Sequence, residues 1–328
     1  MHTYHHQSVS LLDTVGNTPL VSLRESPQDV DIFAKLESFN PGGSIKDRLG
    51  AYILQTLLDR GEITPGGTII EPTAGNTGIG MAVAANQLDL SCVFVVPKGF
   101  SREKEQLMRA LGADIVHVPN EDGMRGAAEK AHDLADQREN AIVPQQFRNE
   151  LNIEAHARTT GSEILEALDG HVGAIIVGIG SAGTLMGIER AIRPHVPDLY
   201  VVGVEPDGST FGRLCGIDRA EGAYKTEGIG THDPAVAELL DPERVDDIMA
   251  ISDRAAHREV ARLAREEGHL VGSSAGAASV AARHVAEDIA NDSTDVPYDT
   301  AVTVFPDGSE RYLSKDIYGS FDEWEGKS

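Results

Sequence analysis

Lys46 stands at the predicted start of a long helix, directly after the small-residue turn NPGGS at 40–44. Because the helix dipole favours anions at this end, a lysine there is electrostatically out of place. The pKa of its amine should be lowered, which favours a nucleophile that forms imines with carbonyl compounds. The alternative is an ordinary surface lysine, since a perturbed pKa marks function only as a tendency.

The segment EPTAGNTG at 71–78 follows a predicted strand and opens a predicted helix. Backbone amides and hydroxyl groups at a helix N-terminus form a cradle for an anion. The residues that suit a carboxylate here are Thr73, Gly75, Asn76 and Thr77. The alternative is a capping turn without a ligand, but a cap needs only one such residue. The segment therefore predicts a carboxylate-binding turn.

The segment GIGSAGT at 178–184 also lies between a predicted strand and a predicted helix. Gly178, Gly180 and Gly183 spell GxGxxG, and Glu205 ends the next predicted strand. This pattern matches the dinucleotide fingerprint, so an NAD-dependent dehydrogenase is one hypothesis. However, such a turn binds any phosphate, and its place at the middle of the chain would require a separate catalytic domain before it. The pattern is therefore more specific for a phosphate than for NAD.

A fourth turn, VGSSAGAAS at 271–279, precedes another predicted helix. Ser273 and Ser274 could contact a ligand there, or could simply cap the helix, which is the commoner fate of such serines.

Short apolar runs alternate with segments of helical period along most of the chain, which predicts an α/β fold with parallel sheets. Ligands bind at the carboxyl ends of such strands, where the four turns lie. The predicted strands are 32–38, 68–73, 92–97, 114–119, 141–147, 174–180, 199–206, 247–252 and 301–306. The predicted helices are 46–61, 76–88, 102–112, 127–137, 153–168, 183–193, 258–268 and 278–290. A domain boundary is predicted near 146–150.

The chain is strongly acidic, with 52 Asp and Glu against 28 Lys and Arg and a net charge of −24. Nucleic acid and anionic membranes would repel it, so neither is expected as a partner. The acidic residues are spread along the sequence rather than gathered in a tail. We expect a hydrated, halophile-like surface suited to a salt-rich cytoplasm, where salt screens the repulsion between carboxylates.

The cysteines and the hydropathy of the chain exclude further classes of protein. The two cysteines, Cys92 and Cys215, form no CxxC and have no histidines at ligand spacing, so neither a disulfide framework nor a metal site is predicted. No apolar run reaches membrane-spanning length, and the first residues lack the basic start of a signal peptide. The sequence predicts a cytoplasmic protein.

Taken together, these turns resemble the cysteine synthase and cystathionine β-synthase family of pyridoxal-phosphate enzymes, which perform β-replacement and have fold type II. The similarity covers nearly the whole chain. Nine motifs carry it in order: NTPLVSL at 17–23, PGGSIKDR at 41–48, EPTAGNTGIG at 71–80, QQF at 145–147, TTGSEI at 159–164, GSAGT at 180–184, EGIG at 227–230, SSAGAA at 273–278 and PDGSERYLS at 306–314.

The resemblance implies a tryptophan synthase β-like fold: two open, twisted, mostly parallel sheets flanked by helices. Residues 46–150 would form a smaller N-terminal domain. Residues 8–45 and 151–328 would form a larger domain that binds the cofactor phosphate. Without a Pro/Gly-rich linker, the two domains should share an extensive interface.

The resemblance also implies a role for each residue of the four turns. Lys46 would be the catalytic lysine that holds pyridoxal 5'-phosphate. Asn76 would bond the ring hydroxyl of the cofactor, and Ser274 its pyridine nitrogen. The phosphate would lie on Gly180, Ser181, Ala182, Gly183 and Thr184. The substrate carboxylate would lie among Thr73, Ala74, Gly75, Thr77 and Gln146.

The implied activity is cysteine synthase, or O-acetylserine sulfhydrylase, a transferase and lyase of amino-acid biosynthesis. It would replace the acetoxy group on Cβ of O-acetylserine with sulfide, through α-aminoacrylate, to give L-cysteine and acetate. A neutral serine at the ring nitrogen suits elimination better than transamination. A homodimer is implied, and a serine acetyltransferase is a possible partner.

Departures from the usual family motifs keep alternatives open. This chain has TAGNTG, GSAGT and NELN (149–152) where relatives often have TSGNTG, GTGGT and NPAN. TAGNTG and SSAG are closer to cystathionine-forming relatives, so a cystathionine β-synthase that accepts homocysteine is the first alternative. A serine or threonine dehydratase comes next. The leaving group could be acetyl, phosphate or hydroxyl.

Overall fold

The structure, a computed structural model, describes residues 9–27, 29–233, 236 and 238–319. The described residues divide into two compact units. Unit 1 contains residues 9–17, 40–42 and 46–144, and unit 2 contains 18–39, 43–45 and the described residues from 145 onwards. Within these residues, no helix is both long and apolar enough to cross a membrane.

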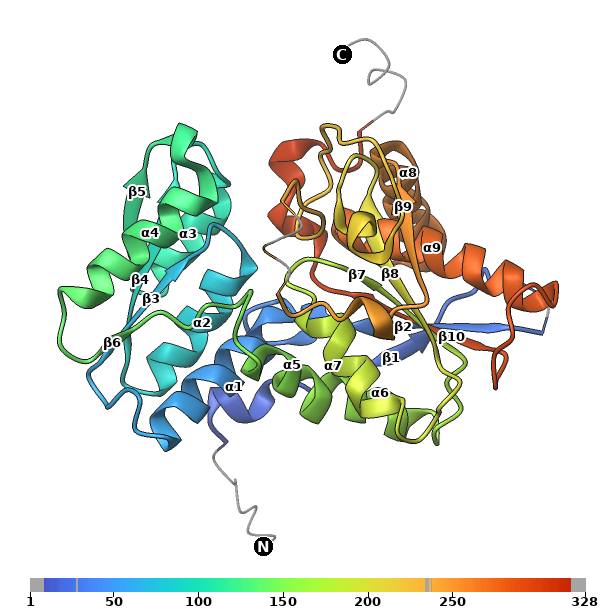
Figure 1. The fold of residues 1–328 in the computed structure, drawn as a ribbon, viewed down its shortest axis with the longest axis horizontal. Helices are drawn as coiled ribbons and strands as arrows, with labels where there is room; N and C mark the ends of the chain where they lie inside the picture. The colour runs from blue at the N-terminus through green and yellow to red at the C-terminus, as the bar shows by residue number, and fades with distance from the viewer. Residues whose placement is uncertain (1–8, 28, 234–235, 237, 320–328) are drawn as a thin grey trace, which may run out of the picture. The chain divides into compact units, whose positions relative to one another are not determined.

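Unit 1 is built on a four-stranded parallel sheet with the order β5-β4-β3-β6. The central strands are buried almost throughout, as parallel strands covered on both faces must be. Its strands are β3 (Thr68–Pro72), β4 (Ser91–Pro97), β5 (Asp114–Val118) and β6 (Ala141–Ile142). Its helices are α1 (Lys46–Asp59), α2 (Asn76–Gln87), α3 (Arg102–Ala110) and α4 (Gly123–Asp136) (Figure 1).

Unit 2 is built on a six-stranded sheet with the order β1-β2-β10-β7-β8-β9. All neighbouring strands run parallel except β1, which pairs antiparallel with β2 at the edge. Its strands are β1 (Leu20–Ser22), β2 (Asp31–Leu36), β7 (Ala174–Gly178), β8 (Tyr200–Pro206), β9 (Asp247–Ile251) and β10 (Thr300–Phe305). Its helices are α5 (Leu151–His156), α6 (Ser162–Ala167), α7 (Gly183–Ile192), α8 (Asp253–Arg262) and α9 (Ser273–Ala290).

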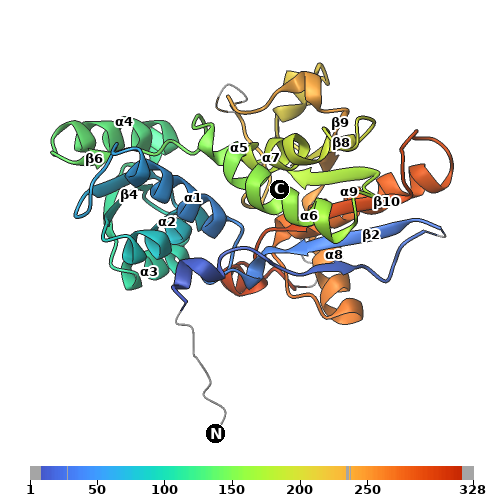
Figure 2. The same cartoon turned by 90° about the horizontal axis from the view of Figure 1, so that it is seen from below.

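Alternating side chains of this sheet enter two separate hydrophobic cores. Ala174 and Ile176 of β7 pack in the core that contains α8 and α9, whereas Ile175 and Val177 pack with α6 and α7. This alternation is the period-2 pattern of a strand. Figure 2 shows α6 and α8 on opposite sides of β2. The predicted fold class, two mostly parallel sheets flanked by helices, is confirmed.

The predicted helix at 153–168 is interrupted. A π-helical segment, Ala157–Gly161, separates α5 from α6, and a second one, Leu263–Glu267, follows α8. Such one-turn segments occur often at functional sites. The predicted strand 141–147 shortens to the two residues of β6, because the chain turns at Gln145, whose φ is +58°.

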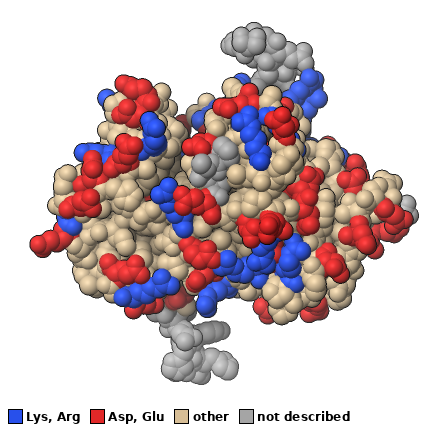
Figure 3. All heavy atoms as spheres, in the orientation of Figure 1, with Lys and Arg blue, Asp and Glu red and all other residues tan. Residues whose placement is uncertain are grey.

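Asp and Glu side chains are scattered over the face drawn in Figure 3, among fewer Lys and Arg side chains, and form no single acidic patch there. This distribution agrees with a solvated acidic surface rather than a binding site for one basic partner.

Candidate functional site

Lys46 is the first residue of α1 and lies in unit 1. Burial lowers the pKa of its amine from the usual 10.5 to about 8. The direction is the one expected from the sequence, and its cause is the loss of solvent around the buried amine. The adjacent Asp47 is buried, and its Oδ2 accepts a hydrogen bond of 2.5 Å from the Gly42 amide. This bond fixes the turn that leads into Lys46.

A close crossing of α1 and α2 holds Lys46 beside the second predicted turn. A Cβ atom added to Gly80 would lie 2.4 Å from the Lys46 carbonyl oxygen, and one added to Gly50 would lie 2.4 Å from the Gly80 carbonyl oxygen. Only glycine permits this approach of two backbones. The crossing therefore positions the lysine relative to the start of α2.

The turn before α2 presents backbone amides without a side-chain cap. The N-cap residue is Gly75, which makes no side-chain cap hydrogen bond. Thr73 Oγ1 instead accepts a bond of 3.3 Å from the Gly75 amide, one residue before the helix. Thr73 and Thr77 are buried, whereas Ala74, Gly75 and Asn76 are partly exposed. The turn fits the anion cradle predicted from the sequence.

In unit 2, residues 179–182 connect β7 to the ten-residue helix α7. The N-cap residue, Ala182, has a left-handed φ of +66° and makes no side-chain cap. A non-glycine residue in this conformation is strained, and such strain gathers at functional sites. Ser181, Ala182 and Gly183 are buried, and Thr184 is half-buried. The start of α7 therefore has no side-chain cap and no acidic residue in its first turn, which fits the phosphate site predicted from the sequence.

Gln146 lies in the same unit and is buried. The Nδ2 atom of Asn152 donates to the Gln146 carbonyl oxygen at 2.8 Å and to Ser181 Oγ at 2.9 Å. The structure therefore connects two predicted site residues through a third residue that sequence reasoning did not single out. Asn152 belongs to the NELN segment at 149–152, which the sequence marked only as a departure from the usual motif.

His156 is a second residue that sequence reasoning missed. It is fully buried at the end of α5, with Nδ1 2.9 Å from Thr160 Oγ1 and Nε2 3.2 Å from Thr184 Oγ1. Thr160 belongs to the π-helical segment, which places its hydroxyl against the ring. No local pattern in the sequence indicates this contact, because it joins α5 to the start of α7, 28 residues further along the chain.

The serine pair that begins α9 does not cap the helix, because the N-cap residue is Gly272 and makes no side-chain hydrogen bond. Ser273 Oγ instead accepts a bond of 3.2 Å from the Glu227 amide, which holds the EGIG segment at 227–230. Ser274 is buried with 4% of its surface exposed. The capping alternative from the sequence is therefore wrong for both serines.

The dinucleotide hypothesis required Glu205 to contact a ribose, but the Glu205 carboxylate is hydrogen-bonded within the protein. It is fully buried at the end of β8 and accepts bonds from the amides of Phe211 (2.8 Å) and Gly212 (3.1 Å). Arg219 Nη1 lies 3.0 Å from the same carboxylate. These contacts give Glu205 a structural role in the loop after β8, so it supplies no support for a ribose site.

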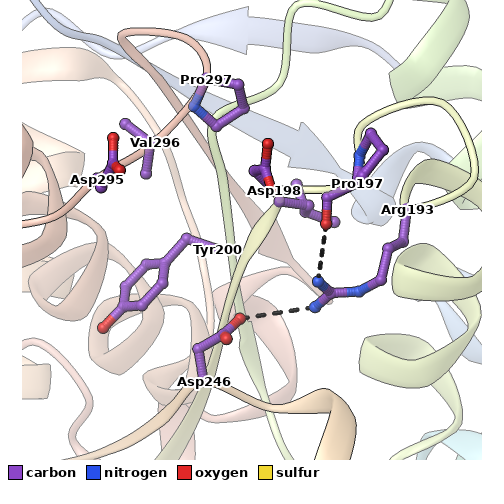
Figure 4. Close-up of a pocket in the computed structure, with 9 residues that line it drawn as sticks. Arg193, Pro197, Asp198, Tyr200, Asp246, Asp295, Val296 and Pro297 are labelled. Carbon is purple, nitrogen blue, oxygen red and sulfur yellow. Dashed lines mark hydrogen bonds and ion pairs between the residues drawn. The ribbon is translucent and has the colours of Figure 1, made fainter.

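A pocket of about 380 Å³ lies at the other end of the sheet, near Tyr200, the first residue of β8 (Figure 4). There Arg193 is directed toward Asp246, at 3.6 Å, and toward the Pro197 carbonyl oxygen, at 3.3 Å. The pocket contains none of the predicted site residues. Among the described residues, no three His, Cys, Asp or Glu are grouped to hold a metal.

Comparison with known proteins gives the class of the protein. A family profile described as "Pyridoxal-phosphate dependent enzyme" matches residues 11–307. The chain is 44% identical to an O-acetylserine dependent cystathionine beta-synthase of Bacillus subtilis (strain 168), over 94% of this chain and 97% of the relative. It is 40% identical to a cysteine synthase of Helicobacter pylori (strain ATCC 700392 / 26695), over 94% and 98%.

A solved structure agrees with these matches. The crystal structure of O-acetylserine dependent cystathionine beta-synthase from Helicobacter pylori superposes with a TM-score of 0.85 and 40% identity, covering 95% of this chain and 99% of that one. The chain therefore belongs to the family of pyridoxal-phosphate dependent enzymes, and its cofactor is pyridoxal 5'-phosphate.

The described residues fit this cofactor. The N-cap residues of α2, α7 and α9 are Gly75, Ala182 and Gly272, none of which has a side-chain acceptor. None of these helices has an acidic residue in its first turn. In contrast, α3 and α8 are capped by Ser101 and Ser252. A lysine whose pKa is about 8, and helix N-termini without side-chain caps, are what an aldehyde phosphate needs.

Proposed function

We propose that this chain is a cysteine synthase that replaces the acetate of O-acetylserine with sulfide to give L-cysteine. The observation that carries the proposal is the buried Lys46 at the start of α1, with its pKa lowered to about 8, held against the anion cradle of α2 by the Gly50 and Gly80 crossing. Relatives named cysteine synthase, 37–40% identical over nearly their whole length, support the assignment.

In this proposal, each group of residues has one task. When bound, pyridoxal phosphate supplies the electron-withdrawing group that stabilises negative charge at the Cα of an amino acid. Lys46 holds the cofactor and takes the α-proton. At pH 7 a lysine with this pKa is neutral in about one tenth of molecules, far more than an exposed lysine. Acetate then leaves from Cβ, and sulfide adds there.

The other proposed roles follow from the chemistry of each segment. The phosphate lies on the α7 loop, which comprises Gly180, Ser181, Ala182, Gly183 and Thr184, and the substrate carboxylate on the turn before α2, with Gln146 as a further contact. Asn76 bonds the ring hydroxyl. Ser274 contacts the ring nitrogen without imposing a charge, which favours elimination over transamination.

Cystathionine β-synthase is a second candidate, because the Bacillus subtilis relative has that name and depends on O-acetylserine. The same residues would perform the first half of either reaction, up to the loss of acetate. The candidates differ only in the thiol that adds. The dependence of that relative on O-acetylserine supports acetate, rather than phosphate or hydroxyl, as the leaving group.

Steady-state turnover tests the proposal. O-acetylserine, O-phosphoserine and serine are each paired with sulfide or homocysteine in concentrated KCl, and cysteine and cystathionine are quantified. We expect the highest kcat/KM for O-acetylserine with sulfide. Lys46→Ala should abolish turnover and the near-visible absorption of the bound cofactor, whereas Lys130→Ala on α4 should change neither. A higher kcat/KM with homocysteine would make the second candidate the better name.

The partners and location are also proposals, and they rest on the resemblance. The chain would act as a homodimer in the cytoplasm and could bind a serine acetyltransferase. Light scattering coupled to size exclusion in high salt tests the first point, since a dimer has twice the 35.0 kDa of one chain.

A further inference from the structure

Asn152, the second residue of α5, is fully buried, and both hydrogens of its side-chain amide are donated in hydrogen bonds. They go to the Gln146 carbonyl oxygen at 2.8 Å and to Ser181 Oγ at 2.9 Å. The orientation of the amide follows from these contacts, because a flipped amide would bring its oxygen against the Gln146 carbonyl oxygen. The side chain therefore acts as a donor to two separate segments at once.

The third contact of Asn152 is with the start of α7. A Cβ atom on Gly183 would lie 2.2 Å from Asn152 Oδ1 and 2.3 Å from its Cγ, so the amide lies flat against the backbone of the phosphate loop. Oδ1 is buried and has no hydrogen-bond partner in the described part of the chain. A buried acceptor without a partner is destabilising, so its retention calls for a reason beyond packing.

The bond to Ser181 has a chemical consequence. A hydroxyl group has one hydrogen to donate and two lone pairs that accept. Because Ser181 Oγ accepts from Asn152, its own hydrogen remains available for an acceptor elsewhere. An anionic phosphate in the loop is such an acceptor. Asn152 thus fixes the direction in which Ser181 donates.

We infer that Asn152 is a positioning residue that sets Ser181 as a donor to the cofactor phosphate and couples that loop to the Gln146 segment. The inference rests on the proposed roles of Gln146 and of the α7 loop. One buried amide then connects the segment that contacts the substrate carboxylate to the loop that anchors the cofactor. Changes at Asn152 should affect the binding of both molecules, whereas changes at Ser181 should affect mainly the cofactor.

Two variants separate hydrogen bonding from packing. Asn152→Asp keeps the shape but replaces the donor with an acceptor, and Asn152→Leu keeps a similar volume without a buried charge. For each purified holoenzyme, the cofactor dissociation constant is measured by dilution and the 31P spectrum is recorded. We expect each variant to raise that constant about tenfold or more, to shift or broaden the phosphate signal, and to raise the KM for O-acetylserine.

Ser181→Ala completes a double-mutant cycle. Alone, it should weaken cofactor binding with little change in KM, and combined with Asn152→Leu it should have less effect than the sum of the two. Asn86→Asp is the matched control, since Asn86 Nδ2 donates to the Leu111 carbonyl oxygen at 2.9 Å in unit 1. It should leave both constants unchanged.

The outcomes are decisive in either direction. If Asn152→Leu folds, and the cofactor dissociation constant and the KM for O-acetylserine both stay within twofold of the wild type, the inference is wrong. Additive effects in the cycle would also overturn it, because they would mean that Asn152 acts only through packing. Should the wild type produce neither cysteine nor cystathionine, the proposed activity fails, yet the cofactor constants and the 31P spectra still decide the role of Asn152.

Discussion

The lowered pKa of Lys46 makes the stability of the cofactor-free protein depend on pH. The native lysine has a pKa of about 8 and the unfolded one about 10.5. Between these values the unfolded state binds more protons, so the free energy of unfolding should rise with pH across this interval. Below pH 8 both states are protonated, and the destabilisation, up to about 3 kcal/mol, is present in full.

Lys46→Met isolates this effect, because methionine has a similar length and no titrating group. Urea unfolding of the cofactor-free proteins at pH 7 and pH 10 gives the comparison. Relative to the wild type, the variant should be more stable at pH 7 and lose most of that advantage at pH 10. An advantage that is equal at both pH values would mean that the lysine is solvated.

At the scale of single residues, the sequence predicted the residues expected to contact a ligand. It did not predict the buried residues that hydrogen-bond to them. Lys46 and Ser181 lie in glycine-containing turns that local patterns reveal. Asn152 and His156 contact Ser181 and Thr184 from a helix about 30 residues earlier in the chain. Such contacts depend on how α5 packs on α7, which no spacing within either segment encodes. The roles assigned to the site residues themselves stay predictions until variants are measured.

At the scale of elements, the crossing of α1 and α2 fixes the position of the Lys46 backbone. In Gly80→Ala, the added methyl carbon would lie 2.4 Å from the Lys46 carbonyl oxygen. The contact is with backbone and cannot be relieved by a rotamer change, so the first turn of α1 must move. We expect a loss of about 1–3 kcal/mol in the free energy of unfolding and a fall in kcat/KM, because Lys46 shifts with the turn.

Gln87→Ala serves as the control in the same helix, since Gln87 is exposed at its end. It should change stability by no more than about 0.5 kcal/mol. Thermal unfolding of both holoenzymes, with kinetics for O-acetylserine, tests the pair. Wild-type activity in a folded Gly80→Ala protein would show that the position of Lys46 does not depend on the crossing.

Most elements were predictable because buried parallel strands and amphipathic helices have distinct apolar periods. The predicted strand at 68–73 corresponds to β3, and the predicted helix at 102–112 to α3. Three features were not predictable in this way. The π-helical segments keep a helical period, the edge strand β1 has only three residues, and α9 begins five residues before its predicted start because Ser273 and Ser274 are helical.

For the whole molecule, the division into two units follows the change from one sheet to the other. The structure places it after Pro144, close to the boundary suggested by the polar turn at 146–150, and assigns residues 9–17 and 40–42 to unit 1. The ends of the larger predicted domain, residue 8 and residues 320–328, lie outside the described residues. The predicted domain limits stay predictions.

The net charge of −24 predicts that the stability of the whole molecule depends on salt. At about 0.1 M salt the screening length is roughly 10 Å, which leaves neighbouring carboxylates repelling each other, and at about 1 M it falls to roughly 3 Å. Salt also weakens attractive pairs such as Arg262 with Glu259, 2.7 Å apart. Because acidic residues outnumber basic ones by 52 to 28, the relief of repulsion should dominate.

We therefore expect the free energy of unfolding to increase as KCl rises from about 0.1 M to 2 M, across the range in which screening becomes strong. Urea unfolding at each concentration measures it. Sucrose at matched osmolality is the control, because it stabilises by exclusion from the surface without screening charge. A gain with KCl well above that with sucrose would identify charge repulsion as the cause. Equal gains would mean that the acidic surface does not limit stability, and the halophile-like interpretation would be wrong.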